Sequence, residues 1–438
     1  MTRTKGNALK AYDYLSDLQQ TVGARLPGSQ GEAKAIAWLQ QQCKAIGLTP
    51  ENERFVYQAD SWLTRIRSAG LAYSMVVLTL LSARLNPWLI LAGVLVSFVV
   101  FGQLWRLLER GTARAVGQNI LAGITRPWSE IVAQPAQRVV FLCAHYDTAP
   151  SVPAWRRSLG RYNDFAAGFA FLGVLILVAY SLVAGSLSVI TATARLAESL
   201  RFIWQSFGAW LVLALGLPGA VIVMLSLLTY RSGGKLSENP GADDNGSGVA
   251  VVLELANKLK QHSTTGVDLA VAFWAAEETG LWGSEAFVEK YQHRLDREKT
   301  LIINVDTVGR GQCLMAVSGE GVLRRRAVDG SVLLQWEQAC QQVGTSTIRE
   351  WLTPLAGSSD HAAWLNSGFN RALSVGRGNL VPIAPPIRLL NRLLGIPTGA
   401  TQTDISHVHS PSDSLTNIRP ECLDETTDGI RTFLDLQV

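Results

Sequence analysis

Histidine and acidic residues collect in short segments that follow apolar stretches of the sequence. His145 and Asp147 lie in "AHYDT", directly after an apolar run, and Asp306 follows the apolar segment "LIINV". Asp243 and Asp244 are adjacent in the glycine-rich segment "NPGADDNGSG". Each segment alone has an ordinary explanation, because Asp, Asn and Ser are also common at the first residue of helices. Together they place several potential metal ligands in one chain.

Two further segments complete this set of residues. In "VAFWAAEETG" an apolar run leads directly into Glu277 and Glu278, and "HVHSPSD" contains His407 and His409. Carboxylates at the end of a buried strand are costly unless they are paired or bind a metal. Imidazole and carboxylate are ligands that zinc and related divalent metals take in proteins. Three acids and two histidines are enough to hold two metals that share one carboxylate.

In this order the segments resemble the two-zinc aminopeptidase family (peptidase family M28), which includes leucyl-type aminopeptidases, glutamate carboxypeptidases and glutaminyl cyclases. The matching segments are "RLPGS" at 25–29, "CAHYDT" at 143–148, "GADDNGSG" at 241–248, "AAEETGLWGS" at 275–284, "NVDTVG" at 304–309, "GSSDHAAW" at 357–364 and "HSPSD" at 409–413. The resemblance covers most of the chain outside its apolar blocks. It implies a zinc aminopeptidase fold, an α/β domain with a mixed, mainly parallel central sheet and helices on both faces.

The resemblance also implies which residues bind metal. His145 and Asp306 would bind one Zn²⁺, and Glu278 and His409 would bind the other. Asp243 would bridge the two ions, and a cis peptide bond would follow it. Two Zn²⁺ per chain bring four positive charges, which three carboxylates and a shared hydroxide would balance, so that both histidines stay neutral.

Supporting roles follow from the same resemblance. Asp147 would orient the ring of His145, and Glu277 would act as the general base that passes a proton from water to the leaving amine. Asp360 and His361 match a family segment that lines the pocket, and we expect them to support the site rather than bind metal. His407 has no counterpart in the family pattern and is interpreted as an ordinary loop histidine.

Hydrophobic periodicity predicts the elements that position these residues. Predicted strands cover 53–57, 119–124, 138–147, 267–275, 300–306, 313–319 and 371–376, and predicted helices cover 7–21, 30–46, 249–259 and the segment after Pro420. Ser29 and Glu32 have the spacing of a helix capping box, and Gly47 would end that helix. Strands that alternate with helices predict a mainly parallel or mixed sheet, with the polar residues at its strand ends.

Apolar blocks interrupt this pattern and raise the mean hydropathy to +0.17. The blocks at 68–83 and 87–105 predict one transmembrane hairpin (68–105), and those at 165–189 and 207–230 predict a second (165–230). Both would be insertions into loops of one peptidase domain, which is thereby divided into 1–67, 106–164 and 231–438. Buried core helices are the alternative interpretation. A lipid bilayer is therefore an expected partner.

The distribution of basic residues predicts an orientation for these hairpins. Their outer ends carry Arg65, Arg67, Arg106, Arg110 and Arg114 in the first pair and Arg156, Arg157, Arg161, Arg231 and Lys235 in the second. The tips carry only Arg84, and Arg195 with Arg201. Positive residues concentrate on the cytoplasmic side of membranes. The chain is thus predicted to be a multi-pass membrane protein with a cytoplasmic catalytic domain, the extracytoplasmic orientation being the alternative.

The predicted function is that of a membrane-anchored zinc exopeptidase, and specifically an aminopeptidase that acts on peptides or small amides. Glutaminyl cyclase-like chemistry and a non-catalytic receptor of the same fold are the alternatives. The net charge of +4, without a basic stripe interleaved with aromatic residues, argues against a nucleic-acid partner. The five cysteines are widely spaced, which predicts free thiols. Neither side-chain specificity nor oligomeric state follows from the sequence.

Overall fold

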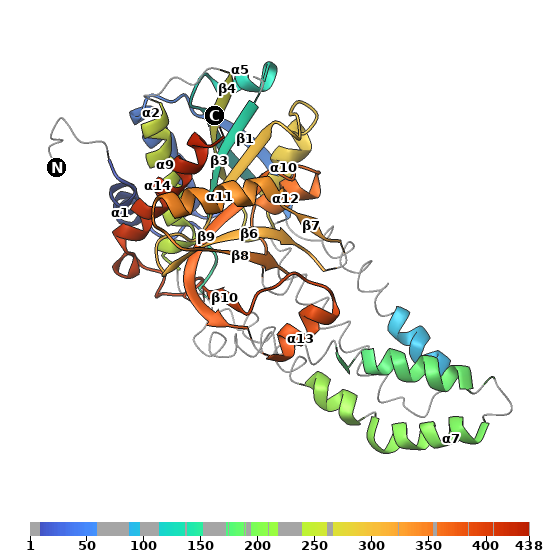
Figure 1. The fold of residues 1–438 in the computed structure, drawn as a ribbon. Helices are drawn as coiled ribbons and strands as arrows, with labels where there is room; N and C mark the ends of the chain where they lie inside the picture. The colour runs from blue at the N-terminus through green and yellow to red at the C-terminus, as the bar shows by residue number, and fades with distance from the viewer. Residues whose placement is uncertain are drawn as a thin grey trace.

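Of the 438 residues, the computed structural model describes 9–58, 87–96, 114–135, 138–151, 172–173, 175–187, 189, 194–208, 210–217, 239–260, 266–322, 324–353, 357–383, 385–405 and 407–437. A ten-stranded sheet with helices on both sides forms the main body, and a group of apolar helices extends away from it (Figure 1). We call the main body the catalytic domain, because it contains the residues predicted to carry out the chemistry, and the extension the helical arm.

The sheet is mixed, with a parallel centre. Its strands are β1 (Glu51–Gln58), β2 (Arg114–Gly123), β3 (Arg138–His145), β4 (Val267–Trp274), β5 (Thr300–Val305), β6 (Cys313–Glu320), β7 (Arg326–Ala327), β8 (Thr347–Leu352), β9 (Ala372–Pro382) and β10 (Thr401–Asp404). Their order is β1-β2-β4-β3-β5-β9-β6-β7, while β10 pairs with β9 and β8 with β6. The strands β4, β3, β5 and β9 are parallel, and the outer pairs β1–β2, β2–β4, β6–β9 and β6–β7 are antiparallel. The predicted α/β class with a mixed sheet is confirmed.

Helices cover both faces of this sheet. They are α1 (Ala11–Thr21), α2 (Gln30–Ala45), α5 (Trp128–Ala133), α9 (Gly248–Leu259), α10 (Trp282–Tyr291), α11 (Gly330–Gln342), α12 (His361–Asn366), α13 (Pro385–Leu393) and α14 (Pro420–Asp435). On one side α9 packs on β3 and β5, with α1 and α14 behind it. Helix α12 packs on β5 and β9 and against α10.

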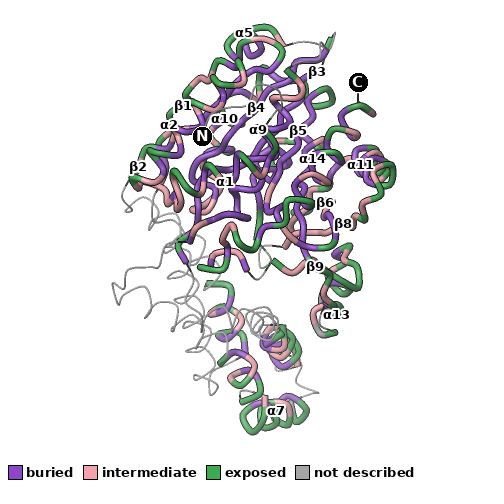
Figure 2. The backbone as a smooth tube through the Cα atoms, turned by 90° about the vertical axis from the view of Figure 1, so that its left-hand side faces the viewer, coloured by how far each residue is buried: buried purple, intermediate pink, exposed green. Residues whose placement is uncertain are grey.

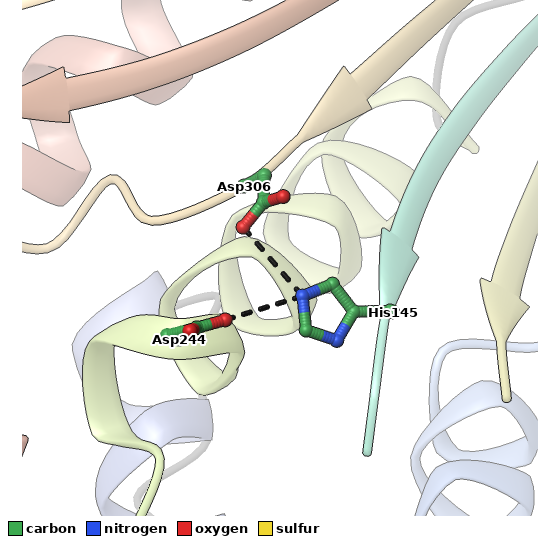
Figure 3. Close-up of side chains that lie close together, drawn as sticks. All are labelled: His145, Asp244 and Asp306. Atoms are coloured by element: carbon green, nitrogen blue, oxygen red, sulfur yellow. Dashed lines mark ion pairs between the residues drawn. The ribbon is translucent and has the colours of Figure 1, made fainter. Parts of the chain in front are cut away.

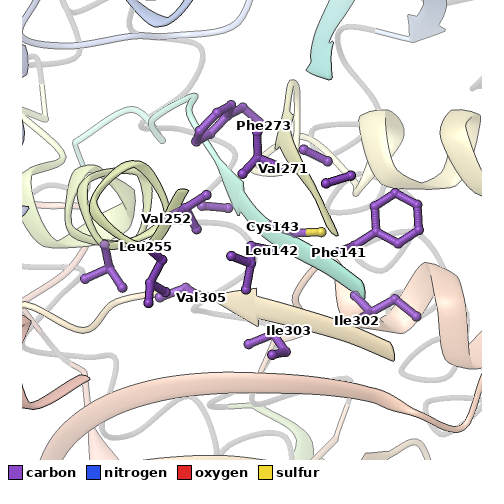
Figure 4. Close-up of a cluster of buried hydrophobic side chains, with 14 of the residues drawn as sticks. Phe141, Leu142, Cys143, Val252, Leu255, Val271, Phe273, Ile302, Ile303 and Val305 are labelled. Atoms are coloured by element: carbon purple, nitrogen blue, oxygen red, sulfur yellow. The ribbon is translucent and has the colours of Figure 1, made fainter. Parts of the chain in front are cut away.

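The central strands are buried along almost their whole length, as parallel strands covered on both faces should be. Phe141 of β3 lies against Phe287 of α10 and Trp364 of α12. Because successive side chains of a strand point to opposite faces, the neighbouring Leu142 lies on the side of α9 and its residue Leu255 (Figure 4). The alternation locks β3 into the middle of the core and thereby positions its last residue.

Helix α2 begins and ends close to the predicted residues. The Ser29 hydroxyl accepts a hydrogen bond from the Glu32 N–H at 3.2 Å, which confirms the predicted cap. The Glu32 carboxylate bonds to the N–H of Gly28 at 2.6 Å, one residue earlier than an ideal capping box. Gly47, with φ of 79°, follows the end of the helix.

The helical arm consists of the helices Pro87–Val96, Leu175–Leu187 and Arg195–Leu217, the last of which overlaps α7 (Ala194–Ile203). These helices share a small core of their own, made of Ile90, Val94, Leu177, Trp204 and Val212. Most of the arm is nevertheless exposed (Figure 2). Exposed apolar side chains include those of Leu182, Val183, Phe202, Ile203, Phe207 and Trp210. Such a concentration of exposed apolar surface marks an interaction with a membrane or another protein.

The arm corrects part of the predicted membrane topology. Within the described residues one helix, Arg195–Leu217, is long and apolar enough to cross a membrane, while Pro87–Val96 and Leu175–Leu187 are shorter. Arg195 and Arg201, predicted at the tip of a hairpin, lie inside this helix because "ARLAESLRFI" is rich in strong helix formers. Two complete hairpins are therefore not shown. The predicted boundaries at 67, 105, 164 and 230 lie outside the described residues.

Candidate metal centre

The candidate metal centre lies where three neighbouring strands end. β3 lies between β4 and β5 in the sheet, and the register pairs His145 of β3 with Trp274 of β4. Glu277 and Glu278 follow β4, and Asp306 directly follows β5. Because the carboxyl ends of parallel strands share one edge, these side chains meet there.

Asp244 connects this edge to a second group of side chains. One carboxylate oxygen of Asp244, Oδ1, lies 3.2 Å from Nε2 of His145, and the other, Oδ2, lies 3.0 Å from Nε2 of His409. Asp306 Oδ1 lies 3.6 Å from the same His145 nitrogen, and Figure 3 shows both acids pointing at it. Glu278 Oε2 lies 3.0 Å from His409 Nε2.

These side chains form two groups with Asp244 in common. His145, Asp244 and Asp306 make the first group, and Asp244, Glu278 and His409 make the second. In each group the potential ligand atoms lie within 4.8 Å of one another. The structure thus brings together His145, Glu278, Asp306 and His409, as the sequence predicts, and the acid that the two groups share is Asp244 rather than Asp243.

The prediction that Asp243 bridges the metals is wrong for this geometry. Its Oδ1 accepts the N–H of Gly309 at 2.6 Å, and its Oδ2 lies 2.6 Å from Nε2 of His407. Both oxygens are therefore occupied away from the ligand groups. His407, which the sequence left without a role, is the partner that holds Asp243. The predicted cis peptide also lies one residue later, between Asp244 and Asn245.

Asp413 holds the turn that contains Asp243 and Asp244. Its carboxylate accepts the N–H of Asp243 at 2.5 Å and the N–H of Asp244 at 3.2 Å. The turn, Ala242–Ser247, leads into α9. Burial raises the pKa of Asp413 to about 8. The sequence places Asp413 at the end of the segment "HSPSD" and does not predict this contact with the backbone of Asp243 and Asp244.

Asp147 lies beside His145 but contacts other groups more closely. Its oxygens accept the N–H groups of Glu277 and Glu278 at 3.1 and 3.2 Å. The distance from Asp147 Oδ1 to His145 Nδ1 is 3.6 Å, which is too long for a hydrogen bond. Asp147 therefore holds the backbone of the two glutamates. It lies close to the imidazole of His145 without a hydrogen bond to it.

Hydroxyl groups fix the carboxylate of Asp306. Ser359 donates to its Oδ2 at 2.6 Å, and Thr307 donates to its Oδ1 at 3.0 Å. Thr307 has φ of 57°, and Ala276 and His409 have φ of 56° and 54°. A non-glycine residue in this region is strained by roughly 1–3 kcal/mol. All three residues lie next to or within the cluster, so the strain is concentrated at this site.

The electrostatics of the cluster suit divalent cations. Burial alone would lower the pKa of His145, but Glu277 and three further carboxylates raise that pKa well above its usual range. Burial raises the pKa of Glu277, and Glu278, Asp360 and Asp306 raise it further. Burial and the neighbouring Asp244 likewise raise the pKa of Glu278. The carboxylates thus lie close enough to oppose one another's charge, and two divalent ions on imidazole and carboxylate ligands would offset that charge.

Asp360 and His361 lie buried behind the cluster. Neither the Asp360 oxygens nor the His361 ring nitrogens have a hydrogen-bond partner within the described residues. Burial raises the pKa of Asp360 to about 7 and lowers that of His361 to about 4. Neither residue belongs to either ligand group, which agrees with the supporting position that the sequence predicts for them.

Arg25 is a buried residue beneath the centre that sequence reasoning left without a role. Its guanidinium donates to the carbonyl oxygens of Tyr146 (2.6 Å), Gly23 (2.8 Å), Pro240 (3.2 Å) and Gly241 (2.7 Å). It therefore ties the segment that follows His145 to the turn that presents Asp244. Gly241 has φ of 61°, and a Cβ there would lie 2.2 Å from Thr148, so a glycine is required at this contact.

All five cysteines are buried and free, as the sequence predicts.

A covered α/β sheet with imidazole and carboxylate groups at its central strand ends offers ligands for divalent metal ions. Residues 229–434 match the model of peptidase family M28. This part of the chain is a peptidase family M28 domain, and it contains Asp244, Glu278, Asp306 and His409.

Curated relatives with similar sequences are peptidases. The chain is 29% identical over 193 residues to the aminopeptidase YwaD of Bacillus subtilis, covering 43% of this chain and 36% of that protein. It is 41% identical over 71 residues to a vacuolar membrane protease of Schizosaccharomyces japonicus, covering 16% of this chain and 8% of that protein. The chain thus spans about a third or less of the length of these relatives.

Solved structures share the fold over nearly the whole chain. A glutaminyl cyclase of Porphyromonas gingivalis aligns with a TM-score of 0.52 at 15% identity, covering 98% of both chains. A Zn-dependent exopeptidase of Parabacteroides distasonis aligns with a TM-score of 0.50 at 14% identity, covering 97% of this chain and 96% of that one. At this low sequence identity, the similarity shows a shared fold and nothing more.

Proposed function

We propose that this chain is a membrane-attached, zinc-dependent aminopeptidase with two metal ions. His145, Asp244 and Asp306 would hold one Zn²⁺, and Asp244, Glu278 and His409 would hold the other. The observation that carries this proposal is the carboxylate of Asp244, whose two oxygens face two different histidines at 3.2 and 3.0 Å. A single metal would leave one of these two groups unused.

Bound zinc supplies a Lewis acid that polarises a scissile carbonyl and lowers the pKa of water. Glu277 is the residue of this chain placed to move the proton. Its Oε2 lies 4.0 Å from His145 Nε2, at the edge of the first ligand group, and it belongs to neither group. Its backbone N–H is fixed by Asp147. Glu277 would accept a proton from the attacking water and donate it to the departing amine.

Aminopeptidase activity is the form of this chemistry that the relatives favour, because the similar Bacillus subtilis protein is named an aminopeptidase. Peptides and small amides would be the substrates. Glutaminyl cyclisation is the competing reaction, since a structure with the same fold is a glutaminyl cyclase. The complete second ligand group favours the two-metal peptidase.

Membrane attachment is proposed from the helical arm. The helix Arg195–Leu217 has 23 residues, enough to cross about 30 Å of hydrocarbon at about 1.5 Å per residue. Only 18% of its most apolar window is buried within the protein, which favours lipid over protein around it. With the basic residues that flank the apolar segments, we propose a cytoplasmic catalytic domain.

The proposal can be tested on full-length protein purified in detergent. Metal content, aminoacyl-anilide hydrolysis and cyclisation of glutaminyl peptides are measured together. We expect two zinc ions per chain and hydrolysis of the anilide. Asp244→Asn should lose metal from both sites, whereas Asp243→Asn, which can still accept the Gly309 N–H, should keep more of it. Glu277→Gln should keep both metals but lose a factor of about 10²–10⁴ in kcat.

Several outcomes would contradict the proposal. The wild-type protein with its zinc restored could fail to hydrolyse any amide, or Glu277→Gln could be as active as the wild type. A retained metal complement in Asp244→Asn would refute the bridging role. Cyclisation without hydrolysis would replace the aminopeptidase by a glutaminyl cyclase, and binding of a partner without metal or turnover would favour a receptor.

A further inference from the structure

The hairpin formed by β9 and β10 has an unusual composition at its tip. Between Gly378 and Thr403 the sequence contains no acidic residue, and its only charged residues are Arg388 and Arg392. Most of the remaining residues are leucine, isoleucine, valine, alanine or proline. Helix α13 lies between the two strands.

Helix α13 exposes both its arginines and its leucines. Arg388, Leu389, Arg392 and Leu393 are all exposed, with Leu389 at 58% and Leu393 at 75%. These residues are spaced one and four apart, so they form a single continuous surface of the helix. Leu380 on strand β9 is also exposed, at 43%, and so is Ile405, which follows β10, at 40%. Exposed apolar side chains that gather in this way mark an interaction surface, and on α13 itself they are accompanied by basic residues alone.

The rest of α13 is fixed to the catalytic domain. Asn391 is buried and donates to Thr398 at 3.2 Å. The N–H groups of Gly395 and Ile396 bond to the carbonyl oxygens of Arg392 and Asn391, which closes the end of the helix. Arg325 donates to the carbonyl oxygens of Leu394 and Gly395. The exposed face is therefore held in a defined orientation.

The position of α13 agrees with a membrane surface. In both views α13 lies at the end of the catalytic domain from which the helical arm extends (Figures 1 and 2). Another exposed arginine, Arg324, is the chain neighbour of the arginine that holds α13. A bilayer that contains the arm would thus have its surface on the side of the domain where α13 projects.

We propose that α13 rests on the surface of the bilayer, with Leu389 and Leu393 at the boundary of the acyl chains and Arg388 and Arg392 against anionic lipid headgroups. Helices that lie in the membrane interface combine an apolar strip with basic residues in this way. The inference rests on the membrane attachment proposed above. A bilayer is favoured over a second copy of the chain because only basic residues accompany the exposed leucines.

The proposal links the bilayer surface to the metal centre. β10 ends at Asp404, and His409 follows five residues later in the same chain segment. Contact of α13 with lipid would fix the far end of the hairpin that leads into this ligand. The mouth of the centre would then open near the headgroups, so that substrates with an anchored or apolar tail would reach it along the surface.

The test uses the full-length protein in vesicles of phosphatidylcholine, with or without phosphatidylglycerol. Leu393→Cys is labelled with an environment-sensitive fluorophore, and lipids that carry a quencher near the headgroup are included. Leu334→Cys on α11, with Leu334 61% exposed, is the matched control. The native cysteines are buried, so labelling is confined to the new residue. Arg388→Glu combined with Arg392→Glu tests the charge.

We expect loss of fluorescence at position 393 and none at position 334, with stronger quenching when phosphatidylglycerol is present. The double charge reversal should abolish that lipid dependence and leave anilide hydrolysis in detergent unchanged. Protein that floats with vesicles but shows no quenching at 393 overturns this inference alone. A label at 393 that is already shielded in detergent indicates a protein partner and also overturns it. Failure to float with vesicles overturns the membrane attachment as well.

Discussion

Asp243 and Asp244 are neighbours of the same type that point in different directions. The sequence places two acids in the turn, and either could bridge the metals. The difference arises from contacts made by distant residues, since Gly309 and His407 occupy both oxygens of Asp243. No local pattern contains that information. His145 and Asp306 lie at strand ends without a neighbour of the same type, whereas Glu278 and His409 each have one, Glu277 and His407, and were distinguished from it by the resemblance to the family.

Arg25 should control the geometry of the centre without touching substrate. Arg25→Lys keeps a positive charge but cannot reach four carbonyl oxygens at once. If zinc binds as proposed, we expect its affinity and kcat to fall by about 10–100-fold each, the usual effect of losing a group that orients metal ligands. Zinc titration by competition with a chelator, together with steady-state kinetics, checks this expectation.

The matched control for Arg25 is Arg126→Lys. Arg126 also uses its forked side chain, in a double contact with Asp268 at the opposite end of β4. Its replacement should leave zinc affinity unchanged. Equal effects of the two substitutions on zinc affinity would assign Arg25 a general role in stability instead.

At the scale of elements, the strands that carry the site were the easiest to predict. β3, β4 and β5 are continuous apolar runs that end in polar residues, and their predicted and observed bounds differ by a residue or two. β8 and β10 were missed. Their sequences, "TIREWL" and "TQTD", contain no continuous apolar run and no fully buried residue. They become strands because β6 and β9 offer them pairing partners.

The start of α2 should make stability depend on pH. Burial raises the pKa of Glu32 from 4.5 to about 7 in the folded protein. The folded state therefore binds the proton more tightly, and the free energy of unfolding falls as pH rises through this window, by up to about 3 kcal/mol. Glu32→Gln removes this loss and can still accept the Gly28 N–H. The stability of the variant relative to wild type should thus increase with pH between 4.5 and about 7.

Denaturant unfolding on either side of this window measures the effect. Ser29→Ala is the matched control, because it removes the other half of the same cap without a titrating group. It should cost about 1 kcal/mol at every pH. If the difference between Glu32→Gln and wild type does not change with pH, Glu32 does not titrate in the predicted range.

At the scale of the whole molecule, the described residues form two separate hydrophobic cores. The large core of the catalytic domain surrounds the sheet, whereas the small core of the arm leaves most of its apolar side chains outside. The apolar segments could be predicted from the sequence because their length and lack of charge are local properties. The start of the long helix was predicted too late, because arginine and glutamate are as compatible with a helix as leucine is.

A charge in the middle of the arm should discriminate lipid from water around it. Phe207 lies near the centre of the helix Arg195–Leu217 and is 75% exposed. Phe207→Arg should cost roughly 3 kcal/mol if this segment inserts into a bilayer and almost nothing if it lies in water. Retention in membranes washed with alkaline carbonate reports the result. Leu334→Arg, on the exposed surface of α11, should remain in the membrane fraction like the wild type.

The position of the arm within the chain has a consequence for the order in which the protein is made. His145 is synthesised before the long apolar helix, and Asp244, Glu278, Asp306 and His409 are all synthesised after it. β3 likewise waits for its two neighbours, β4 and β5, which lie beyond the arm in the chain. A ribosome therefore releases no complete cluster until the apolar helix has already emerged. Metal binding by the complete cluster, if it occurs as proposed, would have to follow the synthesis of that helix.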